Sequence, residues 1–237
     1  MSIDNRKKRA DAATPATYDL SASVMCAKLG ELSAEVSHLE QAGVNSFHFD
    51  VMDGHFVPNL ALSAAMIAAL RPVSKLRFVA HLMVEDPAAF IGPMALAGCD
   101  DFVFHIEASR YPRRVKSEIE DSGMVPGIAI NPATSISALE SVTDMPSVTI
   151  MTVEPGFAGQ AFIATSPERV HKIRMLFGDS AVIFADGHIN PATARPLAEA
   201  GATGFVCGTK SLFRGAHEVS AYAQALEALR AAMPGRH

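Results

Sequence analysis

Residues 47–59 read Phe47-His-Phe-Asp-Val-Met-Asp-Gly-His-Phe-Val-Pro-Asn59 and predict a strand that runs into a tight loop. His48 and Asp50 are two positions apart, so on a strand their side chains point to the same face. Apolar residues alternate with them, so the opposite face is expected to be buried. An imidazole beside a carboxylate suits either a metal ion or a proton-transfer pair, and the alternative is a surface strand with ordinary polar alternation. We take this polar face as the candidate site.

The junction that leads into this strand recurs along the chain as Ala-Gly, three further residues and Phe. The copies are Ala42–Phe47, Ala97–Phe102 and Ala200–Phe205. In each, the pattern predicts a helix that ends at Ala, a left-handed Gly after it, and a strand that starts before Phe. Seven residues past each Gly stand Asp50, His105 and Gly208. In a barrel built from βα units this offset falls at the C-terminal ends of strands, where active sites lie.

Short apolar runs and segments with helical spacing alternate along the chain. The predicted strands are Leu20–Met25, Ser46–Val51, Arg77–Met83, Asp101–His105, Met124–Ile130, Ser147–Val153, Ala181–Asp186 and Gly204–Cys207. The predicted helices are Lys28–Ala42, Ser63–Leu70, Pro87–Ala97, Arg110–Asp121, Ser135–Val142, Pro167–Phe177, Pro191–Ala200 and Ala216–Ala231. This alternation indicates a parallel sheet and, at this length, a closed (β/α)8 TIM barrel as a single domain over residues 19–237. An open doubly wound sheet is the alternative.

Composition restricts the class of protein. The 237 residues carry a formal net charge of −5, and no basic stripe is present, which argues against nucleic acid as a partner. No apolar run approaches the roughly 20 residues of a membrane span, and the N-terminus lacks the apolar core of a signal peptide. Cys26, Cys99 and Cys207 are widely spaced, which fits reduced thiols in a cytoplasmic protein. Residues 1–18 are polar, include Arg6-Lys-Lys-Arg9, and are expected to form a flexible tail.

Four polar residues lie at or near predicted strand ends. They are His48, Asp50, His81 and Asp186. Two imidazoles and two carboxylates suit a divalent transition metal, because Mg and Ca prefer shells of oxygen. Such an ion would polarise a carbonyl oxygen, and two carboxylates on opposite sides of the neighbouring carbon could then exchange protons with it, as in a sugar epimerase. Taken singly, each His could be an ordinary core or cleft histidine. Asp186 could have only a structural role, as an N-cap or turn residue before Gly187.

Glycine-rich loops follow the last three predicted strands, and methionines lie near other strand ends. The loop residues are Gly156 and Gly159, then Gly187 and His188, then Gly208 and Thr209. Backbone N–H groups of such loops bind phosphate, and the loops after strands seven and eight are the usual phosphate site of a barrel. Met52, Met83 and Met151 could fill the core; as a functional alternative, they could form an apolar wall that keeps water from an enediolate.

These motifs resemble the ribulose-phosphate 3-epimerase family over nearly the whole chain from Leu20. The motifs are Ser23-Val-Met-Cys26, residues 47–59, His81-Leu-Met-Val84, Asn131-Pro-Ala-Thr134, Met151-Thr-Val-Glu-Pro-Gly-Phe-Ala-Gly-Gln160 and Gly208-Thr209. Several of them are most similar to the allulose-6-phosphate 3-epimerase branch. The resemblance implies a TIM barrel and a metal-dependent, two-base 3-epimerisation of a ketose phosphate through an enediolate. We also expect a homo-oligomer.

The resemblance further implies a role for each matching position. Asp50 and Asp186 would be the acid–base pair. The ligands of one divalent ion (Zn, Mn, Fe or Co) would be His48, Asp50, His81 and Asp186. Substrate would be bound by Ser23, His81, Met52, Met83, Met151, Gly156, Gly159, Gly187, His188, Gly208 and Thr209, of which Gly159, Gly187, Gly208 and Thr209 would hold the phosphate.

His188 departs from the family pattern, which usually has Gly or Ser after Asp-Gly. A bulkier, chargeable side chain there either disturbs the phosphate geometry or adds a cationic contact to the phosphate. The positive charge of Lys210 would similarly offset a loss of phosphate contacts. The alternatives are therefore a 3-epimerase of a different or unphosphorylated ketose, and a non-catalytic phosphosugar-binding barrel. Retention of both aspartates argues against the second. A decarboxylase with an Asp-x-Lys-x-x-Asp motif is disfavoured, because Met52 stands at the lysine position.

Overall fold

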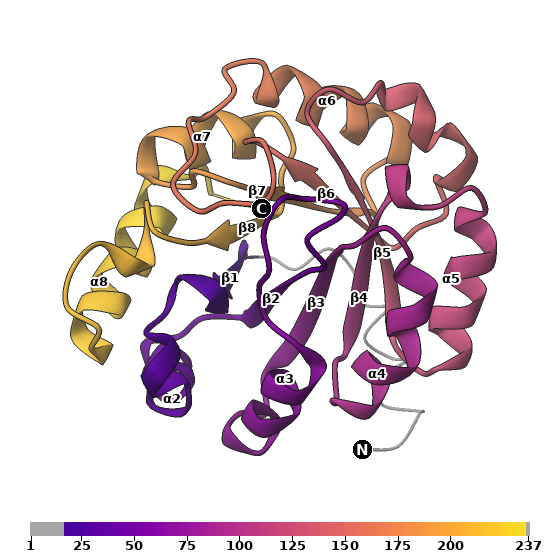
Figure 1. Ribbon diagram of the computed structural model, residues 1–237. Coiled ribbons are helices and arrows are strands. Elements are labelled where there is room, and N and C mark those ends of the chain that lie inside the picture. Colours follow the sequence, from indigo (N-terminus) through magenta and orange to yellow (C-terminus); the bar gives the residue numbers. More distant parts are fainter. Residues whose placement is uncertain (1–16, 236–237) are drawn as a thin grey trace.

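Parallel strands close on themselves in chain order and form a barrel ringed by helices (Figure 1). The computed structural model describes residues 17–235. The strands are β1 (Asp19–Ser23), β2 (Ser46–Met52), β3 (Arg77–Met83), β4 (Asp101–His105), β5 (Val125–Ile130), β6 (Ser147–Met151), β7 (Val182–Asp186) and β8 (Gly204–Cys207). Because β8 pairs with β1, the sheet has no edge. The predicted (β/α)8 TIM barrel is confirmed, and the open sheet is excluded.

The helices cover the outside of the barrel. The α-helices are α2 (Leu32–Ala42), α3 (Ala64–Leu70), α4 (Ile91–Leu96), α5 (Pro112–Asp121), α6 (Ser166–Phe177), α7 (Pro191–Glu199) and α8 (Val219–Ala232). The α-helix predicted over 135–142 is wrong, because the connection between β5 and β6 is the 3₁₀ helix η6 (Ile136–Val142). Its two buried residues, Leu139 and Val142, are three positions apart, and this spacing matches the three residues per turn of a 3₁₀ helix.

The repeated Ala-Gly junction behaves as the sequence predicts. Gly43, Gly98 and Gly201 all have positive φ angles, of 94°, 85° and 114°, which a residue with a side chain rarely adopts. Each ends a helix and turns the chain into the next strand. His105 is accordingly the last residue of β4, and Asp50 lies two residues from the end of β2.

Two predicted strands end earlier in the structure. β1 stops at Ser23, where the 3₁₀ helix η1 (Val24–Cys26) begins. β6 stops at Met151, whose pairing with Asp186 is completed by the hydrogen bond from the Thr152 backbone N–H to the Asp186 carbonyl (2.7 Å). Ser23 and Met151 therefore stand at the rim of the barrel.

Strand alternation sorts the side chains between two layers. Every residue of β2 is buried, and Phe47 and Phe49 pack against the Phe78 ring with centroids 5.7 and 4.7 Å apart. These rings belong to the layer between strands and helices, whereas His48 and Asp50 face the barrel interior. The β2–β3 register places Asp50 opposite His81, so the two polar side chains meet near the C-terminal end.

Charged side chains close the opposite end of the barrel. Arg77, at the start of β3, forms ion pairs with Asp19 of β1 and with Asp101 of β4, the latter at 3.3 Å. Hydrogen-bonded pairs of opposite charge stabilise one another where the side chains are partly buried. The N-terminal end is therefore filled, and the candidate site lies at the other end.

The outer ring of helices is closed by contacts between α2 and α8. The Glu35 carboxylate is 1% exposed and accepts hydrogen bonds from the Tyr222 hydroxyl (2.7 Å) and the His217 Nδ1 (2.8 Å). Burial and the Glu35 charge both raise the pKa of Tyr222, which keeps its hydroxyl a donor. This polar tie joins the first and last described α-helices.

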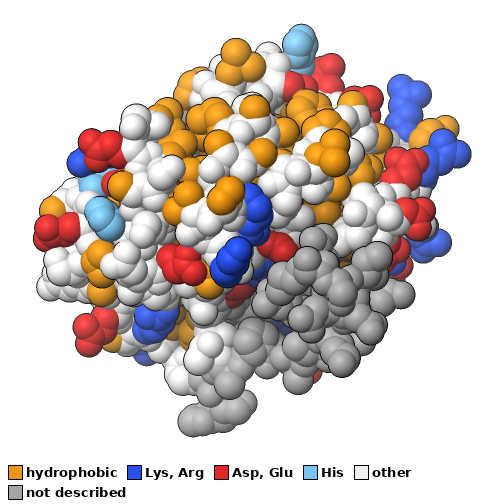
Figure 2. Space-filling model, turned by 90° about the horizontal axis from the view of Figure 1, so that it is seen from below, with side chains coloured by type: hydrophobic (Ala, Val, Ile, Leu, Met, Phe, Trp, Pro, Cys, Tyr) orange, Lys and Arg blue, Asp and Glu red, His pale blue; other side chains and the backbone are white. Residues whose placement is uncertain are grey.

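The predicted tail, residues 1–18, lies outside the described residues except for its end. There the Tyr18 ring packs edge-on against Phe205. Among the described residues visible in Figure 2, Lys and Arg side chains lie next to Asp and Glu side chains and form no continuous basic stripe. Within residues 17–235, no helix is long and apolar enough to cross a membrane. Cys26, Cys99 and Cys207 are unpaired.

We predict that Tyr222→Phe destabilises the fold by about 1–3 kcal/mol, because the buried Glu35 carboxylate loses a donor. Urea unfolding of the variant measures this change. Tyr18→Phe is the matched control, since its hydroxyl donates to the Pro234 carbonyl in an exposed position, and we expect a change within about 0.5 kcal/mol. Equal losses in the two variants would contradict the role of the Glu35 tie.

Candidate active site

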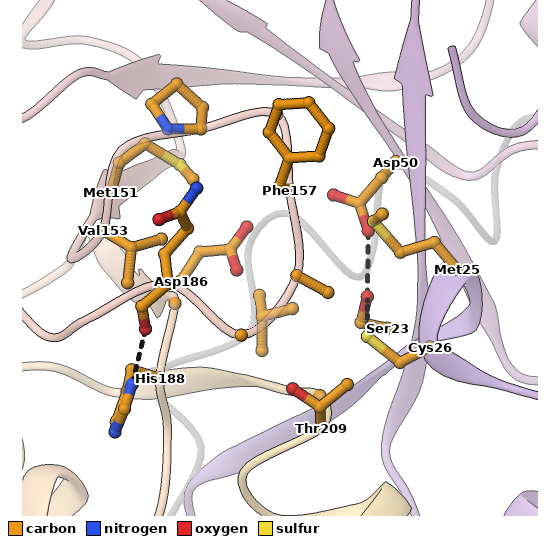
Figure 3. Close-up of a pocket in the computed structure, with 18 of the residues that line it drawn as sticks. Ser23, Met25, Cys26, Asp50, Met151, Val153, Phe157, Asp186, His188 and Thr209 are labelled. Atoms are coloured by element: carbon orange, nitrogen blue, oxygen red, sulfur yellow. Dashed lines mark hydrogen bonds between the residues drawn. The ribbon is translucent and has the colours of Figure 1, made fainter. Parts of the chain in front are cut away.

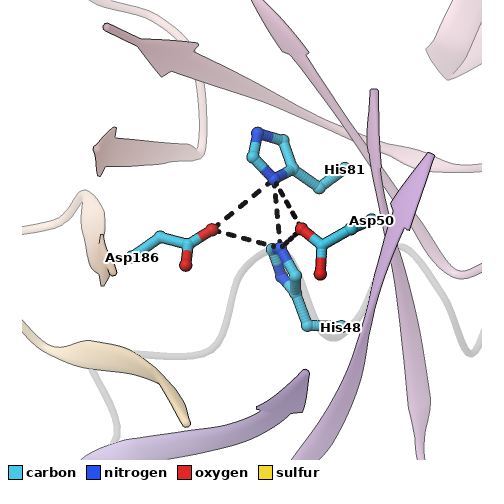
Figure 4. A group of neighbouring side chains, drawn as sticks. All are labelled: His48, Asp50, His81 and Asp186. Carbon is cyan, nitrogen blue, oxygen red and sulfur yellow. Dashed lines mark hydrogen bonds and ion pairs between the residues drawn. The ribbon is translucent and has the colours of Figure 1, made fainter. Parts of the chain in front are cut away.

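The four residues predicted at strand ends converge inside the C-terminal mouth of the barrel (Figure 4). One ligand atom from each lies within 4.8 Å of the others. They come from β2, β3 and β7, and His81 is fully buried. Figure 4 shows the two carboxylates approaching the imidazoles from opposite sides. Barrel closure thus joins residues that are up to 138 positions apart in the sequence, from His48 to Asp186.

The atoms of this cluster fit a cation at its centre. His48 Nε2 and His81 Nδ1 are 3.1 Å apart, and each lies 3.3–3.5 Å from Asp50 Oδ1 and Asp186 Oδ2. Asp186 Oδ2 is buried and has no hydrogen-bond partner among the described residues. A buried carboxylate oxygen without a partner is costly. The chemistry of the donors and this unpaired oxygen both fit a metal ion held by the four side chains.

Electrostatics within the cluster favour positive charge. Burial disfavours protonation of His48, but the nearby charges of Asp50 and Asp186 outweigh burial and raise the pKa of His48 to about 10. Burial works against the Asp50 carboxylate as well, yet His48 and His81 hold the pKa of Asp50 well below its usual range. The cluster therefore holds a proton between its carboxylates. A divalent cation at the same position would neutralise the negative charges of Asp50 and Asp186.

Hydrogen bonds hold both aspartates in place, Asp50 through its side chain and Asp186 through its backbone. The Ser23 hydroxyl donates to Asp50 Oδ2 (2.9 Å), which leaves Asp50 Oδ1 directed at the imidazoles. The Thr152 hydroxyl donates to the Asp186 carbonyl (2.9 Å) and fixes the end of β7. Ser23 was expected to contact substrate; it lines the pocket and also orients Asp50.

A pocket opens above the cluster (Figure 3). All predicted site residues except His48 and His81 line it: Ser23, Asp50, Met52, Met83, Met151, Gly156, Gly159, Asp186, Gly187, His188, Gly208 and Thr209. His48 and His81 do not line it, because they lie beneath it in the barrel. Sequence reasoning assigned no site role to Met25, Phe157 and Gln160, which also line the pocket, although the quoted motifs contain all three.

Met52 of β2 and Met83 of β3 form an apolar wall on one side of the pocket, and Met151 of β6 lies at the start of the loops that face them. Met52 and Met83 pack with Val57 in a small cluster separate from the main core, and Met25 packs against it. Met151 is 4% exposed and faces the pocket from β6. Most of these methionine side chains therefore pack against neighbouring residues and also line the pocket. The two interpretations of the methionines, as core residues and as an apolar wall, are compatible.

The loops after β6, β7 and β8 form the other side. Gly187 has φ 117°, and a Cβ there would approach Val153 Cγ2 to 2.5 Å, so no other residue fits. Asn190 caps α7, accepting from the backbone N–H of Ala192 and Thr193, with Pro191 following. The loop is therefore fixed at both ends and presents its backbone to the pocket.

His188 lies in this loop with an unusual backbone. It is the one non-glycine residue with positive φ (53°) among those the structure describes. Its Nδ1 donates to the Gln160 carbonyl (2.6 Å), so the imidazole points away from Asp50 and Asp186 (Figure 3). The bulk of His188 is thereby turned out of the site, and its side chain joins the loop after β7 to the loop after β6.

Fold and site together define a barrel enzyme whose chemistry lies at the C-terminal ends of its strands. The chain belongs to the ribulose-phosphate 3-epimerase family, whose model matches residues 19–213. It is an isomerase, a ketose-phosphate 3-epimerase. Ribulose-phosphate 3-epimerase of Rhodobacter capsulatus is 39% identical over 214 residues, which are 89% of this chain and 93% of that protein. The enzyme of Methanocaldococcus jannaschii is 38% identical, over 77% of this chain and 79% of its own.

Other relatives and solved structures extend this similarity. The cytoplasmic isoform of Oryza sativa is 36% identical over 94% of this chain and 97% of that protein, whereas an Arabidopsis thaliana relative is chloroplastic. The cytoplasmic location of this chain stays a prediction. A structure of KGPDC from Streptococcus mutans has a TM-score of 0.69 at 12% identity, over 92% of this chain and 99% of that one. At that identity the likeness concerns the fold alone.

We predict that His188→Gly is more stable than His188→Ala by about 1 kcal/mol, because only Gly relieves the left-handed backbone. Both variants lose the hydrogen bond to Gln160, so this loss cancels. The control is His171, which is exposed within α6. There the free energy of unfolding should be about 1 kcal/mol higher for the Ala variant than for the Gly variant. Urea unfolding measures all four, and an Ala variant more stable than Gly at both positions would contradict the strain at His188.

Proposed function

We propose that this chain interconverts the C3 epimers of a ketose phosphate by proton transfer between C3 and two carboxylates. The observation that supports it is the placement of Asp50 and Asp186 on opposite sides of the His48 and His81 imidazoles (Figure 4). A carbon is inverted when a proton leaves one face and another arrives at the opposite face. Two bases that face each other do this without turning the substrate.

A divalent ion completes this proposal. Its ligands would be His48, Asp50, His81 and Asp186, and their two nitrogen and two oxygen donors suit Zn, Mn, Fe or Co. When bound, the ion would act as a Lewis acid that makes the C3 proton more acidic and lowers the energy of the enediolate. The buried Asp186 Oδ2, which has no hydrogen-bond partner among the described residues, supports this assignment.

The two aspartates exchange roles with the direction of reaction. For one epimer the reaction starts with Asp50 ionised and Asp186 protonated. Asp50 takes the proton as the C3–H bond breaks, the electron pair forms the enediolate, and Asp186 donates its proton to the other face, so the two aspartates end with exchanged protonation states. For the second epimer Asp186 is the base and Asp50 is the acid. The Ser23 hydrogen bond keeps Asp50 in one orientation in both directions. Proton transfer of this kind typically contributes about 10²–10⁴-fold to the rate.

The methionine wall serves the enediolate by excluding water. Met52, Met83 and Met151 offer polarisable thioethers and no proton, so they cannot protonate a carbanionic intermediate. Exclusion of water also strengthens the electrostatic interactions of the carboxylates. Met52 and Met83, from β2 and β3, lie across the barrel from the glycine loops after β6 and β7, which leaves the polar end of the substrate to those loops.

The phosphate would be held by backbone N–H groups of the loops after β6, β7 and β8. Gly159, Gly187, Gly208 and Thr209 line the pocket on that side, and such loops bind anions through their N–H groups. Lys210 also lines the pocket and supplies a cation. Because the His188 imidazole is engaged by Gln160, the backbone of its loop stays open to the phosphate.

The substrate that we propose is ribulose 5-phosphate or allulose 6-phosphate. The relatives named above are ribulose-phosphate 3-epimerases, which supports the first. The motifs around Ser23 and Met151 and the Gly208-Thr-Lys-Ser-Leu-Phe213 segment support the second. The expected homo-oligomer stays a prediction.

We predict that the purified chain forms the C3 epimer of ribulose 5-phosphate or allulose 6-phosphate and acts far more slowly on the unphosphorylated sugars, which lack the anion that the loops bind. Epimer formation across these four compounds is measured by chromatography. Treatment with a chelator should abolish it, and Zn, Mn, Fe or Co should restore it. Faster turnover of the free sugars would overturn the phosphate assignment, and full activity after chelation would overturn the metal assignment.

We predict that Asp186→Asn blocks deuterium exchange at C3 for one epimer, and that Asp50→Asn blocks it for the other, with losses of at least about 10² in rate. Exchange in D₂O is followed by proton NMR for each epimer separately. Metal content is determined in both variants, because loss of the ion would stop exchange in both directions. The exposed Asp121→Asn is the control, and normal turnover of Asp186→Asn would overturn the two-base assignment.

A further inference from the structure

His105 and Glu107 lie behind His81, on the side away from the carboxylates. His105 ends β4 and is fully buried. Its Nε2 is 2.9 Å from His81 Nε2, and the two rings meet edge to edge, with planes inclined by 21° and centroids 5.0 Å apart. The Phe56 ring packs on His105 at 4.8 Å. His105 does not line the substrate pocket, so it reaches the site only through His81.

Glu107 lies next to the other nitrogen of His105. Its Oε2 is 3.3 Å from His105 Nδ1, and its Oε1 accepts the backbone N–H of Asn131 (2.9 Å). Burial opposes the Glu107 carboxylate, but hydrogen bonds from His105, Thr134 and Asn131 lower its pKa to about 2. The carboxylate is thus anchored to the end of β5 and directed at the imidazole.

Only one of the two facing Nε2 atoms can carry a hydrogen, which leaves two arrangements. In the first, His81 donates, so His105 accepts at Nε2 and carries its hydrogen on Nδ1, where the N–H faces the Glu107 carboxylate at 3.3 Å. In the second, His105 donates to His81, and a bare His105 Nδ1 then faces the Glu107 carboxylate. Two lone pairs opposed at 3.3 Å repel. His81 Nδ1 faces the Asp50 and Asp186 carboxylates at 3.4 and 3.5 Å, so with a cation between these atoms the Glu107 carboxylate selects the first arrangement.

The first arrangement decides what His81 presents to the four-residue cluster. With its hydrogen on Nε2, His81 has a free lone pair on Nδ1, the atom that lies 3.1 Å from His48 Nε2 and 3.4 Å from Asp50 Oδ1. A metal ion needs that lone pair. In the second arrangement Nδ1 carries the hydrogen and cannot ligate.

We propose that Glu107 and His105 are positioning residues that hold His81 in its metal-binding tautomer and so raise the affinity of the cluster for a divalent ion. The inference rests on the proposed metal site and deepens it. The partner of a metal-ligating His is usually a carboxylate or carbonyl in direct contact, and its loss typically weakens metal binding about 10–100-fold. Here a second imidazole transmits the preference of a carboxylate that does not contact His81.

The test is titration of the metal-free, full-length protein with Co²⁺, followed by visible absorption and calorimetry. Glu107→Gln keeps the shape but offers an amide N–H that can donate to a bare His105 Nδ1, so the second arrangement becomes available. We expect its Kd for Co²⁺ to rise about 10–100-fold. The exposed Glu140→Gln is the matched control and should leave Kd unchanged.

A second variant separates positioning from packing. The side-chain carbonyl of His105→Gln can accept from His81 Nε2 without help from Glu107, so adding Glu107→Gln to it should cause no further loss of Co²⁺ affinity. Independent additive losses in the double variant would overturn the series arrangement. If Glu107→Gln lowers the Tm of the metal-free protein while Kd stays at the wild-type value, the pair is only structural and this inference fails. If the wild-type chain binds no Co²⁺, the metal site of the proposed function fails with it.

Discussion

The convergence of the Asp50 and Asp186 carboxylates on one pair of buried imidazoles is the interaction on which the rest of the site depends. Two carboxylates removed from water at short range repel each other and lose hydration. They are stable together only with positive charge between them, which a proton or a metal ion supplies. His48 and His81 are placed to hold either one, and the barrel keeps all four groups from moving apart.

Two kinds of scaffold divide the work around this cluster. Rigid strands hold the groups that would exchange protons and bind the ion, because β2, β3 and β7 are paired on both sides within the closed sheet. Loops after β6, β7 and β8 face the polar end of the pocket, where backbone N–H groups matter more than side chains. The His188 contact to Gln160 links two of these loops at the expense of a strained backbone.

Local patterns in the sequence predicted the strand positions well, because hydrophobic runs and glycine junctions depend on near neighbours along the chain. The Ala-Gly junctions located the ends of β2, β4 and β8 for this reason. The segment 135–142 was mispredicted, since seven residues with two buried side chains do not distinguish α from 3₁₀ spacing until they pack against the barrel. The predicted role of Ser23, a contact with substrate, omitted its hydrogen bond to Asp50 for a similar reason, because Asp50 lies on the next strand.

The sequence by itself determined that this chain forms alternating strands and helices, and that two imidazoles and two carboxylates stand at strand ends. Those features follow from side-chain alternation and from glycine geometry, which act over a few residues. Tertiary structure alone decided which nitrogen faces which oxygen, that the His188 side chain points away from Asp50 and Asp186, and that His105 lies between Glu107 and His81. Such contacts join residues far apart in the chain, and their geometry is set by barrel closure and strand register.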